Sequence, residues 1–182
     1  MKTTFSTYKT RLSVLSFPSR SDAIAYLGRS NFIDLTDTAS EDYQCHFRVV
    51  EYQNGMQYLL ASETDDDLLI IPYSEENFIW AYDHFLYSIS LEKWTPNWIH
   101  DCGEPIWNVL ISNSRILVHT ELGLRLLNHD GTMQWEVHFG ELIGDVRVDN
   151  GAVIVEDFYR KTSRLSLETG QQIEPRVGVF SR

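Results

Sequence analysis

His100, Asp101 and Cys102 are three neighbouring residues whose types could do chemistry together. A histidine beside a cysteine can take the thiol proton and so create a nucleophile. In an extended strand, residues two apart share a face, so His100 and Cys102 would point to one side and Asp101 to the other. The pair is the candidate for a small enzyme or ligand binder, and the competing interpretation is a buried, inert cysteine.

Other motifs of catalysis or cofactor binding are missing from the sequence. The chain has no HExxH, GxxxxGK[ST], GxGxxG or GxSxG pattern. His119 and His138 do not follow a metal-ligand spacing, and the acidic stretch around Asp65 lacks the alternating oxygen ligands of a calcium loop. We therefore expect a non-catalytic protein with no catalytic residue, no metal site and no cofactor.

The acidic charge is unevenly distributed. The net charge is −11, and the stretch Val49–Glu92 contains no Lys or Arg. Acidic surfaces repel nucleic acid, whose phosphates need clustered Lys and Arg, and they attract basic proteins. The sequence predicts a protein-binding module for a basic partner, in its sharpest version an immunity or antitoxin-type protein that blocks a cationic toxin such as a nuclease. The expected contact residues are Glu63, Asp65, Asp66, Asp67, Glu75, Glu76 and Trp94.

An internal repeat with a period of 37 residues organises the chain from about Trp80 onwards. The shift lays Gly103 on Gly140, Glu104 on Glu141 and Trp98 on Trp135. A period in this range is typical of stacked or radially arranged units. Because Glu104 and Glu141 take like positions in neighbouring units, we expect them to have a structural role, and we expect the two tryptophans to pack between sheets. Trp94 stands where later copies have glycine, so it is either an exposed anchor or packs back onto a sheet.

Each unit resembles a blade of the pyrroloquinoline-quinone-type β-propeller repeats. The residues 116–148 form four short apolar runs separated by turns, which indicates a small antiparallel sheet. The resemblance rests on a strand that ends in Leu, then Asp130-Gly131 or Glu168-Thr169-Gly170, and a nearby Trp. The Asp-Asn-Gly-x-Val-Ile-Val stretch at 149–155 adds to it. The resemblance covers about half the chain and implies a fold. It implies no cofactor and no function.

The fold expected is all-β, a small or incomplete β-propeller of antiparallel repeats, with a β-sandwich or rolled meander as the alternative. We expect one domain, 1–182, in which 1–42 is an N-terminal strand and helix segment and 43–182 holds the repeats. Arg11–Phe17 is a strand that could complete the last copy and close a ring, residues 1–8 are loose, and Ser21 caps a helix that ends at Gly28. Asn54-Gly55 predicts a hairpin.

The two cysteines, Cys45 and Cys102, are far apart in sequence and form no CxxC pair. A reducing, cytoplasmic location is therefore expected. The binding-protein hypothesis adds the expectation of a bacterial-like protein. The run Leu12–Phe17 is too short and too rich in serine for a signal peptide, and no stretch approaches the ~20 apolar residues of a membrane helix. We expect no membrane partner. Pairing of free sheet edges could give self-association, which leaves a self-assembling scaffold as a further alternative.

Overall fold

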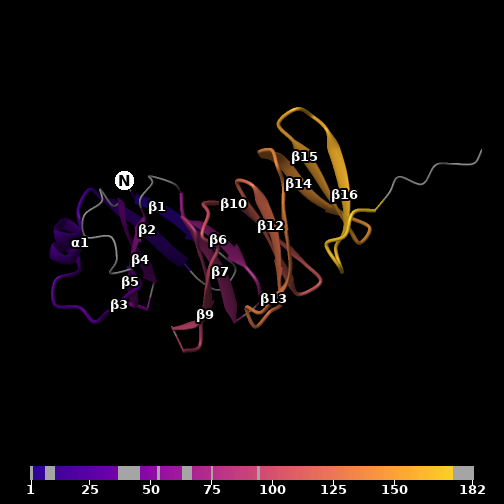
Figure 1. The fold of residues 1–182 in the computed structure, drawn as a ribbon. Helices are drawn as coiled ribbons and strands as arrows, with labels where there is room; N and C mark the ends of the chain where they lie inside the picture. The colour runs from indigo at the N-terminus through magenta and orange to yellow at the C-terminus, as the bar shows by residue number, and fades with distance from the viewer. Residues whose placement is uncertain are drawn as a thin grey trace, which may run out of the picture.

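The protein is a row of four β-sheets standing face to face (Figure 1). The computed structural model describes residues 2–6, 11–36, 46–52, 54–62, 67–74, 76–93 and 95–173, with side chains from residue 12 onwards. Sheets A to D follow one another along the chain. Apolar layers lie between A and B, between B and C, and between C and D. This arrangement confirms the all-β, propeller-like prediction, and in the described residues the row stays open.

The first sheet, A, has five strands, and one helix packs against it. Its strand order is β1-β2-β4-β5-β3, and β3 runs parallel to β5 while the other pairs are antiparallel. The elements are β1 (Lys2–Ser6), β2 (Arg11–Phe17), α1 (Arg20–Leu27), β3 (Phe32–Asp34), β4 (His46–Tyr52) and β5 (Gln57–Ser62). The expectation of loose residues 1–8 is wrong for Lys2–Ser6, which pairs with β2 along its whole length.

Sheets B and C are regular four-stranded meanders, and D has three strands. The strands of B are β6 (Leu69–Pro72), β7 (Asn77–Tyr82), β8 (Phe85–Ser90) and β9 (Pro96–Asp101). Those of C are β10 (Ile106–Ser112), β11 (Arg115–Thr120), β12 (Gly123–Leu127) and β13 (Met133–His138). Those of D are β14 (Ile143–Asp149), β15 (Ala152–Asp157) and β16 (Thr162–Ser166). An isolated bridge joins Leu165 of β16 to Gln172.

The core consists of apolar layers between successive sheets. Sheets A and B enclose Trp80 and Tyr58, both fully buried, and sheets B and C enclose Ile79 and Ile116. Leu117 and Val153 belong to the layer between C and D. Because strand residues alternate between faces, neighbouring residues such as Ile116 and Leu117 supply two different layers. This explains why the middle strands read as continuous apolar runs.

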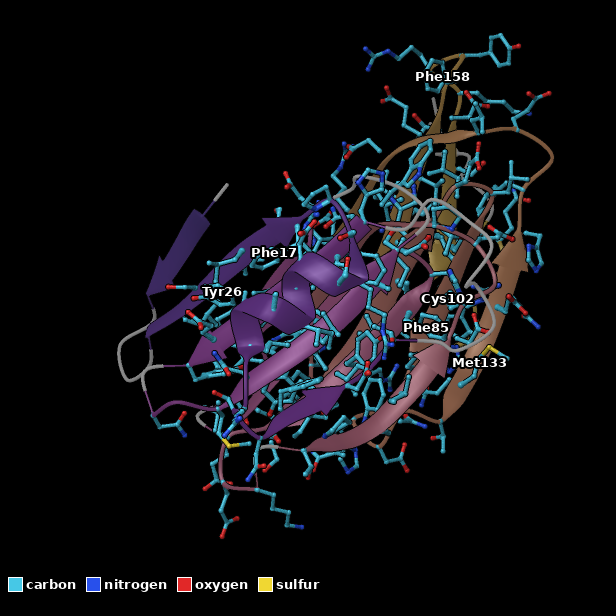
Figure 2. The ribbon with its side chains drawn as sticks, turned by 90° about the vertical axis from the view of Figure 1, so that its left-hand side faces the viewer. Phe17, Tyr26, Phe85, Cys102, Met133 and Phe158 are labelled. Carbon is cyan, nitrogen blue, oxygen red and sulfur yellow. The ribbon has the colours of Figure 1, made fainter. Side chains whose placement is uncertain are left out.

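Helix α1 closes the N-terminal end of the row. Ala23 and Leu27 are buried against Val49 and Leu59 on the outer face of sheet A, and the Tyr26 ring lies 5.2 Å from the Phe17 ring (Figure 2). The helix begins earlier than predicted, because Ser19, and not Ser21, is the N-cap and accepts a hydrogen bond from the Asp22 amide. Gly28, with φ of 62°, ends the helix as expected.

The C-terminal end of the row is polar. On the outward face of sheet D, Arg147, Ile154 and Arg164 form one row across the three strands, and both arginines are exposed. The corresponding row on sheet C packs into the layer beneath D and consists of Leu110, Leu117 and Leu126. Within the described part of sheet D, this row is therefore more polar than the row of sheet C that the next sheet covers. Strand β2 pairs with β4 inside sheet A, so the predicted ring closure by Arg11–Phe17 is wrong.

Candidate functional site

Turns and links from sheets B, C and D gather at one end of the strands, which we call the loop face. In sheet B the Cys102 amide donates to the His84 carbonyl and the Ile106 amide to that of Asp83. In sheet C the Phe139 amide donates to the Leu122 carbonyl, and in sheet D that of Phe158 donates to Leu142. The loop face thus comprises turns 83–84, 121–122 and 158–161, links 102–105 and 139–142, Asp67 before β6 and Asp101 at the end of β9.

An acidic residue recurs at the same position of each link on the loop face. Glu104 precedes β10, Glu141 precedes β14, and Asp67, which is exposed, precedes β6. The three are spaced by the repeat period of 37 residues. Residue identity across the repeat matches only the two glutamates. The third acidic residue, Asp67, was missed because it is an aspartate, although the same shift of 37 residues leads to it.

Glu104 has the structural role that the repeat predicted. Its carboxylate accepts the Thr120 hydroxyl at 2.8 Å and the Leu122 amide at 3.4 Å, and so ties the link from sheet B to the β11–β12 turn. Its other oxygen lies 3.8 Å from Nδ1 of His138. Glu141 takes the same place at the next junction, where it lines a cavity.

Arg125 is a buried cation at the junction of sheets B and C. Its side chain is 10% exposed, and its Nε lies 2.5 Å from the Glu136 carboxylate on the neighbouring strand. Its Nη1 donates to the Cys102 carbonyl, which belongs to the preceding link. Burial lowers the pKa of the guanidinium, but the hydrogen bonds and charge interactions with Glu136 and Cys102 together outweigh it, with a net upward shift. The arginine therefore stays charged and connects the two sheets.

The predicted His100–Cys102 pair is not arranged as a nucleophile. Cys102 is 3% exposed and packs in the layer between sheets B and C (Figure 2). Burial raises the pKa of its thiol to about 11, in spite of the nearby Arg125 guanidinium. Burial also lowers the pKa of His100. A protonated, enclosed thiol is a poor nucleophile, so the structure favours the inert cysteine.

Cys102 is expected to react very slowly with an aromatic disulfide reagent in the native protein at pH 7.5. The expected rate is below about a hundredth of that of the unfolded chain, because the thiol must first be exposed and then ionised. Variants that keep one cysteine, Cys45→Ser or Cys102→Ser, assign the measured rates. A fast reaction of Cys102 at neutral pH would restore the nucleophile hypothesis.

His119 lies buried in the interface of sheets C and D. It is 5% exposed, its ring meets that of Trp107 at a centroid distance of 5.7 Å, and Nε2 has no hydrogen-bond partner among the described residues. Burial lowers the pKa of this imidazole, against the opposing effects of a hydrogen bond to the Ile143 backbone and of the Asp145 charge. The ring is therefore neutral in the folded protein at pH 7.

Stability is expected to fall as the pH is lowered through the ordinary histidine pKa of 6.5. A folded-state pKa below this value means that the unfolded chain binds the proton more readily, so acid favours unfolding. The contribution of one such group is at most about 1.4 kcal/mol per pH unit. Urea unfolding at pH 7.5 and 5.5 should show the loss, and His119→Asn should reduce it. An unchanged slope in the variant would exclude His119 as the source.

The structure separates the described members of the predicted partner site. Asp67 precedes β6 and Glu76 precedes β7, so the two exposed carboxylates lie at opposite ends of strand β6. Only Asp67 belongs on the side of the loop face. The other predicted contact residues, Glu63, Asp65, Asp66, Glu75 and Trp94, lie outside the described residues, so for them the assignment stays a prediction.

Two cavities flank the β15–β16 hairpin of sheet D. One, of about 160 Å³, lies on the side of sheet C and is lined by Phe139, Gly140, Glu141, Val155, Asp157, Lys161 and Ser163. The other, of about 240 Å³, opens on the outward face, where Arg160 pairs with Glu156 at 2.5 Å. Phe158, at the tip of the hairpin, is 67% exposed (Figure 2).

The described residues contain no group of three or more His, Cys, Asp or Glu side chains that could hold a metal ion. The helix they include, α1, has eight residues, and no described helix has the length and apolar character to cross a lipid bilayer.

Solved structures with low sequence identity share the fold. No protein-family model and no curated protein matches the chain. The computationally designed Ika8 protein matches 71% of this chain with a TM-score of 0.54 and 9% identity, and Sqt1 of Saccharomyces cerevisiae matches 75% with 0.53 and 12%. BamB from Moraxella catarrhalis matches 63% with 0.49 and 13%.

The chain is shorter than these proteins. It covers 45% of the Ika8 protein, 45% of Sqt1 and 39% of BamB. These likenesses show the fold alone, and together with the four antiparallel sheets they bear out the propeller-like, all-β fold that the repeat predicted. At such identities a shared fold says nothing about function.

Proposed function

We propose that this protein is a non-catalytic protein-binding module whose loop face receives a basic protein. The observation that carries the proposal is that exposed acids, Asp67, Asp101 and Glu141, lie at or next to the links of successive repeats on this one face. A predominantly acidic surface steers a basic partner and fixes its orientation.

A cationic toxin such as a nuclease is the sharper form of this partner. A nuclease binds phosphate through clustered Lys and Arg, and an acidic protein with a net charge of −11 can cover that cluster. The protein would then act as an immunity or antitoxin-type inhibitor. Cys102, buried and with a raised thiol pKa, supports a binding role over a thiol enzyme.

The test is affinity capture of partners from the source cell with two variants that remove the same charge. The loop-face variant carries Asp67→Asn, Glu121→Gln and Glu141→Gln. The control variant neutralises exposed acids at the opposite ends of the strands, Glu92→Gln, Asp149→Asn and Glu168→Gln. We expect a stoichiometric basic protein with the wild type and the control, weaker at raised salt, and about tenfold less with the loop-face variant. Equal capture by both variants would refute the loop face as the binding surface.

A nuclease assay separates the sharper form from the general one. If the captured protein cleaves nucleic acid and the wild-type module inhibits it, the immunity interpretation holds. If the captured basic protein has no such activity, the module is a binding protein of another kind.

A further inference from the structure

The cavity between sheets C and D has a filled counterpart between sheets B and C. The repeat shift lays Glu104 on Glu141, Cys102 on Phe139 and Val118 on Val155. Arg125 lies directly across the strand pair from Val118, and Ser163 lies in the same way across from Val155. The position that holds Arg125 at the first junction therefore holds a serine at the second.

Arg125 shows what this position can hold. At the B–C junction the guanidinium binds the Cys102 carbonyl of the link and the Glu136 carboxylate, and its side chain is only 10% exposed. A guanidinium presents a planar set of donors that fits carbonyl and carboxylate oxygens. The fold thus builds, at this place of a repeat, a site that encloses a guanidinium.

The second junction keeps the link residues of the site, but it lacks the side chain that would fill it, and its lining holds no counterpart of Glu136. With Ser163 in place of arginine, a cavity of about 160 Å³ remains, next to the Glu141 carboxylate and the link residues Phe139 and Gly140. A water molecule takes about 30 Å³, so there is room for a guanidinium. Asp157 stands where the first junction has the neutral Thr120, which adds a negative charge to the lining.

One oxygen of the Asp157 carboxylate accepts hydrogen bonds, and the other accepts none from the described residues. Its Oδ1 accepts the backbone amides of Tyr159 and Lys161, both at 2.9 Å, which fixes the carboxylate at the end of strand β15. Lys161 also lines the cavity, and its ammonium would compete with an incoming cation. The side chain of Lys161 therefore opposes binding, whereas Glu141 and Asp157 favour it.

We propose that the cavity of sheets C and D binds a guanidinium group, supplied by an arginine side chain of a protein partner. The guanidinium site itself stands on the comparison of the two junctions, and only the source of the group rests on the proposed function. The partner's arginine would enter the cavity from the loop face. Its guanidinium would then lie at the position in sheet D that corresponds to Arg125 in sheet C. This would give the acidic face one specific anchor for its partner.

The first arm of the test uses small probes and the full chain. Nα-acetyl-arginine methylamide is titrated against ¹⁵N-labelled protein, with Nα-acetyl-lysine methylamide as the matched probe. We expect saturable shifts of the Gly140 and Ser163 amides with the arginine probe and binding at least about tenfold weaker with the lysine probe. Equal binding of both probes, or no saturable shift, would overturn the proposal.

Variants of the lining locate the site. Ser163→Arg should fill the cavity from within and abolish binding, while Thr162→Arg adds the same charge on the other face of strand β16 and should leave it intact. Glu141→Gln should weaken binding about tenfold and Lys161→Met should strengthen it. If Ser163→Arg does not fold, the opposite effects of Glu141→Gln and Lys161→Met still decide, and unchanged affinity in both would refute the site.

The second arm separates the site from its source. If the arginine probe binds but Ser163→Arg captures the basic partner as well as the wild type does, the cavity is a guanidinium site for small molecules and the partner anchors elsewhere. If no basic partner is captured at all, the proposed function fails while the guanidinium site stands. Loss of capture in Ser163→Arg, but not in Thr162→Arg, is the result expected for an inserted arginine.

Discussion

Gly131→Ala is expected to lower the free energy of unfolding by about 3 kcal/mol. Gly131 has φ of 83°, and a Cβ there would lie 2.6 Å from Cδ2 of Trp98. The left-handed backbone costs an alanine about 1–2 kcal/mol, and the displaced indole adds the remainder. Trp98 cannot easily move away, because its Nε1 donates to the His129 carbonyl at 3.0 Å. Urea unfolding followed by tryptophan fluorescence measures the loss.

Gly151→Ala is the matched control for this substitution. Gly151 has φ of 76°, but a Cβ there would meet nothing within 4 Å. Its cost should be limited to the backbone, so the difference between the two variants isolates the contact with Trp98. Losses of equal size would show that the indole does not depend on a glycine beneath it.

Arg125→Met is expected to lower the free energy of unfolding by about 2–3 kcal/mol. Methionine keeps the apolar stem but removes the guanidinium that Cys102 and Glu136 share. The Glu136 side chain is 28% exposed, so water replaces part of the lost interaction and keeps the cost below that of a fully buried pair. Thermal and urea unfolding of the variant provide the measurement.

Arg147→Met is the control for loss of a surface arginine. Its guanidinium lies 3.8 Å from Asp145, and both side chains are 62% exposed, so the change should stay within about 0.5 kcal/mol. The single variant Glu136→Gln and its combination with Arg125→Met complete a double-mutant cycle. A coupling free energy near zero would mean that Arg125 stabilises the junction through its packing alone.

The repeats were predictable because each carries its own turn chemistry and apolar alternation. The match of Trp98 with Trp135 predicted that both have the same role. Each indole lies against a glycine of the next sheet, Gly131 or Gly170, and donates to a backbone carbonyl there. The two-residue alternation of the strands and the Asp-Gly turn were enough to align the two repeats and so to predict this shared role. These signals are local, and local signals survive in a single sequence.

The N-terminal sheet was harder to predict because its order depends on contacts distant in sequence. Strand β1 is stabilised by pairing with β2, and the three-residue β3 by a parallel pairing with β5. Neither segment shows an apolar alternation of its own. Nothing in the sequence favours Ser19 over Ser21 as the helix cap, since both are serines close to the same acidic residue, Asp22.

The acidic partner surface stays a prediction, and its place in the fold could not be read from the sequence. Charge alone indicated an acidic binding surface, but charge along the sequence does not show which end of a strand a carboxylate occupies, as Asp67 and Glu76 illustrate. The role of Arg125 and the cavity beside Ser163 left no sequence signal that could be recognised beforehand. They became visible only when the two junctions could be compared atom by atom.

The row of Arg147, Ile154 and Arg164 on sheet D limits how further repeats could be added to this protein in evolution. A tandem duplication adds a new blade only if the blade before it offers an apolar face, and Arg147 and Arg164 withhold that face. At the other end, helix α1 occupies the equivalent surface. Replacing both arginines with leucine would therefore give sheet D an exposed apolar face, on which a further sheet or a second copy could pack.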